Sequence, residues 1–383
     1  MKIATMVRGY ITAPRPKDIV YAPIDLAVAI SEHLTKRGHD VTYFGPTGSH
    51  IHTTVETHGL APLVHNQTEF DDLLHNVDLM THEMPGLREH YYALDMFQRA
   101  QAGEFDLLHF HHPEVALPYA QLFPDVPVVY TLHDPIADWH KDSFHLYTSP
   151  NQHFISISES QRRPAPDLPY AATVYNGTDT EAFSFEKEHD DYLLFVGRVV
   201  SEKGIKEAVE IAQATDYRLF IIGPTYNDQR EAYNRFVKPH LNEKILYLGF
   251  LEQQEVVRYY QKAKALLMPI QWEEPFGLTM IEAMACGTPV IGFNRGSVSE
   301  VVVHEKTGFV VNTLAEAIEA VDRTDEINSL ACRRHVVDKF SIAKMVDGYE
   351  EAFHKIVGSQ VLSPTRRFKQ AIRSVRRPSL IPK

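Results

Sequence analysis

The sequence predicts an α/β protein with two Rossmann-like domains, each a doubly wound parallel sheet, that face one another across a cleft. Three observations lead to this prediction. Short apolar runs alternate with amphipathic helical patterns in both halves of the chain, as in βαβ units. The 383 residues exceed the usual size of a single hydrophobic core. A charged stretch poor in aliphatic residues, 178–191, separates the halves and is typical of an interdomain crossover.

The expected first domain comprises residues 1–178. It begins with a strand and an amphipathic helix, and later β-rich runs are spaced widely enough to leave room for helices between them. Strands are expected at 2–7, 39–45, 105–112, 127–134, 153–158 and 172–177, and the helix at 24–38.

The expected second domain comprises residues 179–345 and repeats this alternation. Strands are expected at 192–198, 217–223, 244–250, 265–270, 288–293 and 308–311, and helices at 205–213, 252–263 and 279–285. A helical pattern at 340–357 ends the compact body, and the last helix is assigned residues 346–360.

Composition favours a soluble protein of a reducing compartment. No apolar run approaches the roughly 18 residues that a membrane span needs, and the two cysteines, Cys286 and Cys332, form no disulfide framework. A cytoplasmic location is expected.

The last residues, 364–383, carry seven cations and no acid, although the net charge is −12. This tail is either disordered, which is the favoured interpretation, or held at the anionic inner membrane surface. No nucleic-acid partner is expected.

The most informative segment is 272–290, in which two carboxylates flank a glycine turn. Pro275 biases Glu274 toward extended backbone, Gly277 permits a tight turn, and the helix that follows stops at Gly287. The free amides of Phe276, Gly277 and Leu278 at the start of this helix are suited to a sugar or phosphate.

Glu282 lies within that helix and can point back toward the same ligand, where a carboxylate suits the hydroxyls of a ribose. The alternative is an exposed acidic turn in front of an ordinary helix.

Two cations follow the strand at 192–198. Gly197 and Arg198 end the strand, and Lys203 stands just before the next helix. Ligands of open α/β sheets bind at the carboxyl ends of strands, so both cations can bind a diphosphate and stabilise it as a leaving group. The alternative is a pair of surface cations near a turn.

Other candidates also lie at strand ends. His133 is placed to meet a sugar hydroxyl, or else is a satisfied half-buried histidine. Phe250 and Leu251 are placed either to contact a nucleobase through their backbone or simply to pack. The cluster of His109, His111 and His112 lacks an accompanying carboxylate or cysteine, so no metal site is expected there.

Together these segments resemble the retaining group 1 glycosyltransferases, a family with the GT-B fold. The resemblance covers most of the chain, and the glutamate-x7-glutamate pattern at Glu274 and Glu282 is its most specific part. The matching segments are 37–44, 105–112, 175–183, 196–204, 247–263, 273–290 and 297–311.

The resemblance implies a role for each candidate. Arg198 and Lys203 are expected to bind the donor diphosphate, Glu282 the ribose, Glu274 with the three helix-start amides the sugar, and His133 the sugar from the first domain. The helix around Tyr349 is expected to cross back onto the first domain.

The implied reaction moves a hexosyl unit from a nucleoside-diphosphate sugar to an acceptor hydroxyl with retention, in glycan, cell-envelope or glycolipid biosynthesis. The donor is a co-substrate, and no catalytic metal is expected. The acceptor stays open among glycan, lipid and small metabolite.

One departure from the family pattern concerns the loop after the first strand. The family usually has a glycine pair there, whereas this chain has Ala22 and Pro23, and proline lacks an amide donor. This departure keeps open a non-catalytic sugar-nucleotide-binding module as a rival function. A sugar-nucleotide epimerase of related architecture is a further alternative.

Overall fold

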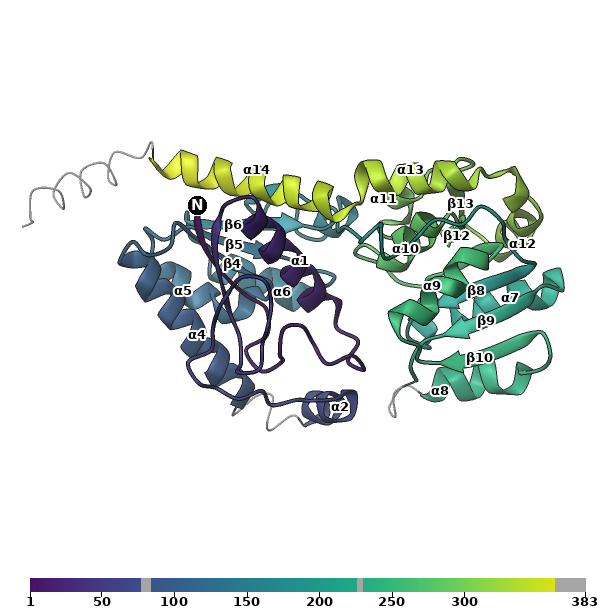
Figure 1. Cartoon of the computed structure of the whole chain (residues 1–383), viewed down its shortest axis with the longest axis horizontal. Coiled ribbons are helices and arrows are strands. Elements are labelled where there is room, and N and C mark those ends of the chain that lie inside the picture. Colours follow the sequence, from purple (N-terminus) through teal and green to yellow (C-terminus); the bar gives the residue numbers. More distant parts are fainter. Residues whose placement is uncertain (77–83, 226–229, 362–383) are drawn as a thin grey trace, which may run out of the picture.

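The computed structural model describes residues 1–76, 84–225 and 230–361, which form two α/β domains placed side by side (Figure 1). All neighbouring strands in both sheets run parallel to one another. The expected fold class, two doubly wound parallel sheets, is therefore confirmed.

The first domain is built on a seven-stranded sheet in the order β3-β2-β1-β4-β5-β6-β7. Its strands are β1 (Lys2–Met6), β2 (Asp40–Phe44), β3 (Thr54–Glu56), β4 (Leu107–Phe110), β5 (Val128–Thr131), β6 (Gln152–Ser156) and β7 (Tyr170–Thr173). Its helices are α1 (Ala22–Lys36), α2 (Gln67–His75), α4 (Met84–Gln101), α5 (Leu117–Leu122) and α6 (Asp138–Leu146).

The second domain is built on a six-stranded sheet in the order β10-β9-β8-β11-β12-β13. Its strands are β8 (Tyr192–Val196), β9 (Arg218–Ile222), β10 (Ile245–Gly249), β11 (Ala265–Met268), β12 (Val290–Phe293) and β13 (Gly308–Val311). Its helices are α7 (Ile205–Thr215), α8 (Arg230–Ala232), α9 (Gln253–Lys262), α10 (Leu278–Cys286), α11 (Val298–Val301), α12 (Leu314–Asp322) and α13 (Ser329–Lys339).

Strand order determines where a ligand can enter each sheet. The first strand of each domain lies inside its sheet, β1 between β2 and β4, and β8 between β9 and β11. The chain winds in opposite directions from these strands, so the loops after them separate and leave a crevice at the carboxyl end. The loops that follow β1 and β8 are therefore the expected walls of a binding site.

The last helix, α14 (Ile342–Val361), follows the second domain in sequence but lies along the first (Figure 1). Tyr349 and Phe353 are fully buried in one apolar cluster with Ile30 of α1 and Ile155 of β6. Arg37, just after α1, donates to Asp347 and Glu350 of α14 at 2.8 and 2.6 Å. The helix around Tyr349 is thus a structural part of the first domain.

The chain crosses between the domains at two places that lie in contact. Thr178 and Ser341 form a parallel bridge, one on each crossing. A Cβ atom on Gly177 would lie 2.7 Å from the carbonyl oxygen of Ser341, so only glycine fits this approach. The domains are therefore joined by paired backbone segments at one point.

Ala22 and Pro23 are the first two residues of α1, where the amide has no partner within the helix in any case. Proline therefore removes no helical hydrogen bond there, although it still offers no amide to a ligand in the cleft that it lines. The tail at 364–383 lies outside the described residues. Among the helices that the structure describes, none combines the length and hydropathy of a membrane span.

Replacing Phe353 with alanine is expected to lower the free energy of unfolding by about 3–5 kcal/mol, because a fully buried aromatic ring would leave a cavity under α14. Urea denaturation followed by circular dichroism measures the change. Lys355→Ala, an exposed position on the same helix, is the matched control and should stay within about 0.5 kcal/mol of the parent. Equal values for the two variants would show that α14 does not stabilise the first domain.

Candidate active site

A cleft of about 300 Å³ lies between the two domains. The first domain contributes the start of α1 and the loop after β5, including Tyr21, Pro23 and His133. The second contributes the loops after β8 and β11 and the start of α10. These are the carboxyl ends of strands, where the topology predicted a site.

An ion pair stands in the second-domain wall of this cleft. Nζ of Lys203 lies 2.5 Å from Oε2 of Glu274, and the two side chains are only 17% and 9% exposed. Trp272 donates from Nε1 to the same carboxylate oxygen at 2.9 Å, and its ring lies 4.5 Å from the Lys203 ammonium. Lys203 and Glu274 are therefore fixed by their mutual ion pair and by contacts with the Trp272 indole.

Lys203 reaches Glu274 because the loops after β8 and β11 touch. Gly204 has φ +75°, and a Cβ atom on it would lie 1.8 Å from the carbonyl oxygen of Pro269. The amide of Gln271 donates to the carbonyl of Glu202 at 2.8 Å. Close backbone approach, which requires glycine at 204, thus places the lysine against the glutamate.

The loop that carries Glu274 is fixed from its other side by the turn before α11. The amide of Ser297 donates to the carbonyl of Glu274 at 3.0 Å, and the Ser297 hydroxyl donates to the carbonyl of Phe276 at 2.7 Å. A Cβ atom on Gly296 would lie 2.3 Å from the backbone nitrogen of Glu274. The orientation of Glu274 is therefore set by backbone contacts on both sides.

The start of α10 has the predicted geometry for an oxygen-rich ligand. Gly277 is left-handed at φ +80°, and no side chain caps the helix there. The helix ends at Gly287, also left-handed, as expected. Gly277 and Leu278 line the cleft with Thr279, so the positive end of the helix faces the space beside Lys203.

Glu282 is half-buried further along α10. The hydroxyl of Tyr260 donates to its Oε2 at 2.9 Å. Burial raises the pKa of Glu282 to about 7, against the lowering effect of the tyrosine, and the nearby Asp25 of α1 raises it further. Glu282 is not among the residues that line the 300 Å³ cleft.

Three other candidates of the second domain also lie apart from this cleft. Arg198 pairs with Glu202 at 3.0 Å and leaves 35% of its side chain exposed. Phe250 is exposed after β10, and Leu251 packs partly against the core. Gly197 does line the cleft. The structure therefore brings Lys203, Glu274 and the α10 start together, while Arg198 faces its own helix turn.

His133 is the predicted site residue of the first domain, and it lines the cleft. Its Nε2 lies 2.8 Å from Nδ1 of His111, and the two rings are stacked. Burial lowers the pKa of His133 to about 3, so the ring is neutral at physiological pH. His109 bonds instead to Thr131 and His112 to Tyr21, so the three neighbouring histidines point to three different partners.

Sequence reasoning missed three residues that contribute to the site. Trp272 was inside the motif but was given no role. Asn176 lines the cleft, is 3% exposed, and its Oδ1 has no hydrogen-bond partner among the described residues. Glu300 accepts from the amides of Glu159 and Ser160, both at 2.7 Å, and so links the domains. Of these residues, only Asn176 carried a signal in the sequence, as a polar residue directly before a glycine at the end of an expected strand.

Two family models match adjoining parts of the chain. Residues 26–182 match the model described as glycosyltransferase family 4, and residues 178–338 match the model described as glycosyl transferases group 1. The boundary between the matches falls at the crossover next to Gly177.

Curated relatives match in part. An uncharacterised 41.2 kDa protein of the cps region of Klebsiella pneumoniae is 31% identical over 171 residues, which is 42% of this chain and 45% of that protein. The chain thus matches less than half the length of that relative. The N-acetyl-alpha-D-glucosaminyl L-malate synthase of Bacillus anthracis is 24% identical over 311 residues, 69% of this chain and 78% of that protein.

Solved structures share the fold over nearly the whole chain. Sucrose-phosphate synthase from Thermosynechococcus elongatus has a TM-score of 0.70 at 16% identity and covers 94% of this chain and 100% of its own. Anabaena HepE in complex with UDP-glucose has a TM-score of 0.65 at 15% identity and covers 93% and 100%. Likeness at these identities shows the GT-B fold. The two family models, which together match residues 26–338, show that the chain belongs to the group 1 glycosyltransferases.

Proposed function

We propose that this glycosyltransferase moves a hexosyl unit from a nucleoside-diphosphate sugar to an acceptor hydroxyl with retention of anomeric configuration. The observation that carries the proposal is the Lys203–Glu274 pair beside the uncapped start of α10, inside an interdomain cleft. A structural neighbour solved in complex with UDP-glucose supports a nucleotide-sugar donor. The acceptor and the pathway stay open among glycan, lipid and small-metabolite synthesis.

In the proposed complex the diphosphate lies against Lys203 and the first amides of α10. The ammonium and the helix dipole stabilise the charge that grows on the diphosphate as the sugar leaves. Arg198 joins them by turning away from Glu202, a surface ion pair that costs little to break. Positioned cations perform this neutralisation, so the proposal includes no catalytic metal.

Glu274 is proposed to bind sugar hydroxyls rather than to attack the anomeric carbon. Its Oε2 already accepts from Lys203 and Trp272, and an oxygen held by two donors is a weak nucleophile. Retention then follows from attack of the acceptor on the same face that the diphosphate leaves. Neutral His133, opposite in the first domain, offers a hydrogen bond to a sugar hydroxyl.

We also propose that the protein works in the cytoplasm. Cys286 and Cys332 are both buried and unpaired, which suits a reducing compartment. Contact of the basic tail with an anionic membrane is a separate proposal that rests on sequence alone.

A panel of UDP-, GDP- and ADP-sugars tests the function. One donor is expected to raise the melting temperature of the protein and, with an acceptor present, to yield free nucleoside diphosphate and a product of unchanged anomeric configuration. Binding without any release would indicate a non-catalytic module. Release with inversion would refute the retaining mechanism, and solvent deuterium in the recovered donor sugar would indicate an epimerase.

Lys203→Ala is expected to lower kcat by about 10²–10³-fold, because it removes a donor aimed at developing charge on the diphosphate. Release of nucleoside diphosphate measures the rate, and a thermal melt checks folding. Lys206→Ala is the matched control, since Lys206 is an exposed lysine of the same helix region that pairs with Glu210 at 3.5 Å. Similar rates in both variants would exclude Lys203 from the reaction.

Donor affinity is expected to depend on pH through Glu282. With its pKa at about 7, the carboxylate is ionised above that pH, when it accepts from ribose hydroxyls, and protonated below it. Affinity should therefore fall about tenfold per pH unit as the pH drops below about 7. Calorimetry with a nucleotide sugar, whose diphosphate diester does not titrate in this range, measures it. Glu282→Gln should bind weakly at every pH, and an unaltered slope in that variant would assign the titration elsewhere.

A further inference from the structure

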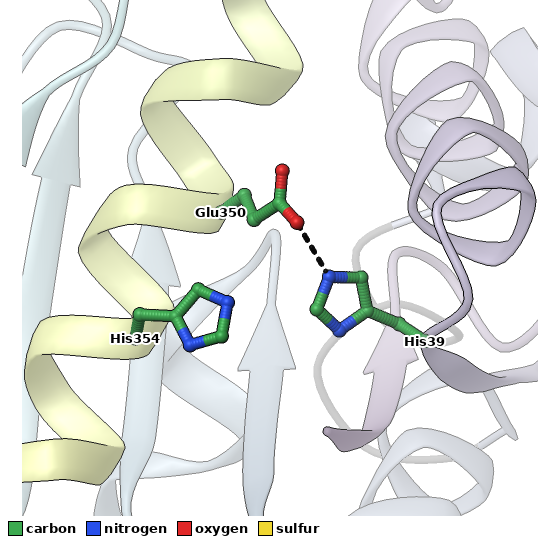
Figure 2. Close-up of side chains that lie close together, drawn as sticks. All are labelled: His39, Glu350 and His354. Carbon is green, nitrogen blue, oxygen red and sulfur yellow. Dashed lines mark hydrogen bonds and ion pairs between the residues drawn. The ribbon is translucent and has the colours of Figure 1, made fainter.

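Three side chains with metal-binding atoms converge away from the cleft, where α14 meets the turn between α1 and β2. Figure 2 shows Glu350 and His354 of α14 directed toward His39. The ligand atoms of the three residues all lie within 4.8 Å of one another. We propose that His39, Glu350 and His354 bind one divalent transition metal ion of the zinc class.

The backbone already supplies the spacing that such a site needs. Glu350 and His354 stand four residues apart on α14, so their side chains share one face of the helix. His39 approaches from the neighbouring element, with its Nε2 2.8 Å from Oε1 of Glu350 and its ring 5.8 Å from that of His354. A metal ion between them replaces the proton that His39 shares with the carboxylate and releases it to solvent.

Groups around the three ligands hold them in place. Arg37 donates to Oε2 of Glu350 at 2.6 Å, which leaves Oε1 directed toward His39. The α-amino nitrogen of Met1 lies 3.2 Å from Nδ1 of His39. The guanidinium contact is of the kind that orients the ligands of protein metal sites. The Met1 amine must lose a proton or move when the metal binds Nε2 of His39, because Nδ1 then carries the ring proton.

The ligand chemistry selects the ion. Two imidazoles and one carboxylate suit zinc and its neighbours rather than calcium or magnesium, which prefer oxygen ligands alone. None of the three residues lines the sugar-nucleotide cleft, so the ion is not catalytic. It instead fastens α14 to the first domain at the surface, since His39 is buried while His354 is exposed.

His354 separates this proposal from a purely electrostatic contact. Arg37 and His39 both pair with Glu350, and those pairs need no metal. Within the described part of the chain, His354 contacts the His39 ring but makes no hydrogen bond or ion pair. Without a metal ion, its removal changes little.

The experiment uses the full chain, stripped of metal with a chelator. Cobalt(II) is titrated in as a spectroscopic probe, and melting temperature is measured with and without zinc. Wild type is expected to show one tight cobalt site with the visible absorption of low-symmetry coordination, and zinc should raise its melting temperature by about 2 °C or more. His354→Ala should lose both responses while its metal-free melting temperature stays unchanged.

His50→Ala, which removes an exposed histidine of the same domain, is the matched control and should retain both responses. The proposal is overturned if His354→Ala still binds cobalt like wild type, or if zinc leaves the melting temperature of wild type unchanged. Glycosyl transfer by the metal-free protein should equal that of the zinc-loaded protein. A loss of transfer on stripping would refute the non-catalytic role without bearing on the proposed reaction.

Discussion

The ion pair between Lys203 and Glu274 is the constraint on which the rest of the site depends. Both groups are nearly removed from water, and an isolated charge in such a place is costly. Removing one partner of a buried pair typically costs about 3–5 kcal/mol, because the other charge is left uncompensated. The two loops that carry these residues must therefore be built together. The glycines at 204 and 296 serve this end, since each allows a backbone contact that a side chain would block.

The same pair explains how the site can hold two buried charges before a charged ligand binds. Lys203 and Glu274 neutralise each other while no donor is bound, and Trp272 supports both groups. In the proposed complex each finds a second partner, the ammonium a phosphate and the carboxylate a sugar hydroxyl. The same logic applies to Glu282 in the proposed complex, where burial opposes its charge and the ribose is proposed to supply hydrogen-bond donors. In the proposed complex the ligand thus supplies hydrogen-bond partners to charged groups that the fold shields from water.

The sequence predicted the strands of both sheets far better than the helices between them. Parallel strands are short runs buried on both faces, and each expected strand is present, with β7 two residues earlier than predicted. The segments that were not anticipated are β3, α2, α4, α5 and α6 in the first domain and α8, α11, α12 and α13 in the second. Several are short or expose large apolar residues, as α6 does with Trp139 and Leu146, so their hydrophobic period is weak.

The motif at 273–290 was predictable because proline and glycine fix local backbone, and Gly277 and Gly287 have the left-handed conformations that their positions require. The partner of Arg198 was not predictable. A glutamate four residues later on the same turn competes with any distant ligand, and this local pairing depends on a side-chain rotamer that sequence does not fix. The role of Glu300 was not predictable either, because only the tertiary fold brings its partners at 159 and 160 near it.

The sugar loop, residues 269–277 between β11 and α10, packs against both crossings between the domains, and this packing restricts movement between them. Tyr175 on the first crossing and Phe340 beside the second pack on one another at 5.5 Å, and Phe276 of the sugar loop packs on both, at 6.1 and 5.9 Å. Buried aromatic contacts of this kind are close-packed and yield little. The three rings therefore hold Phe276 and the start of α10 in place where the domains meet.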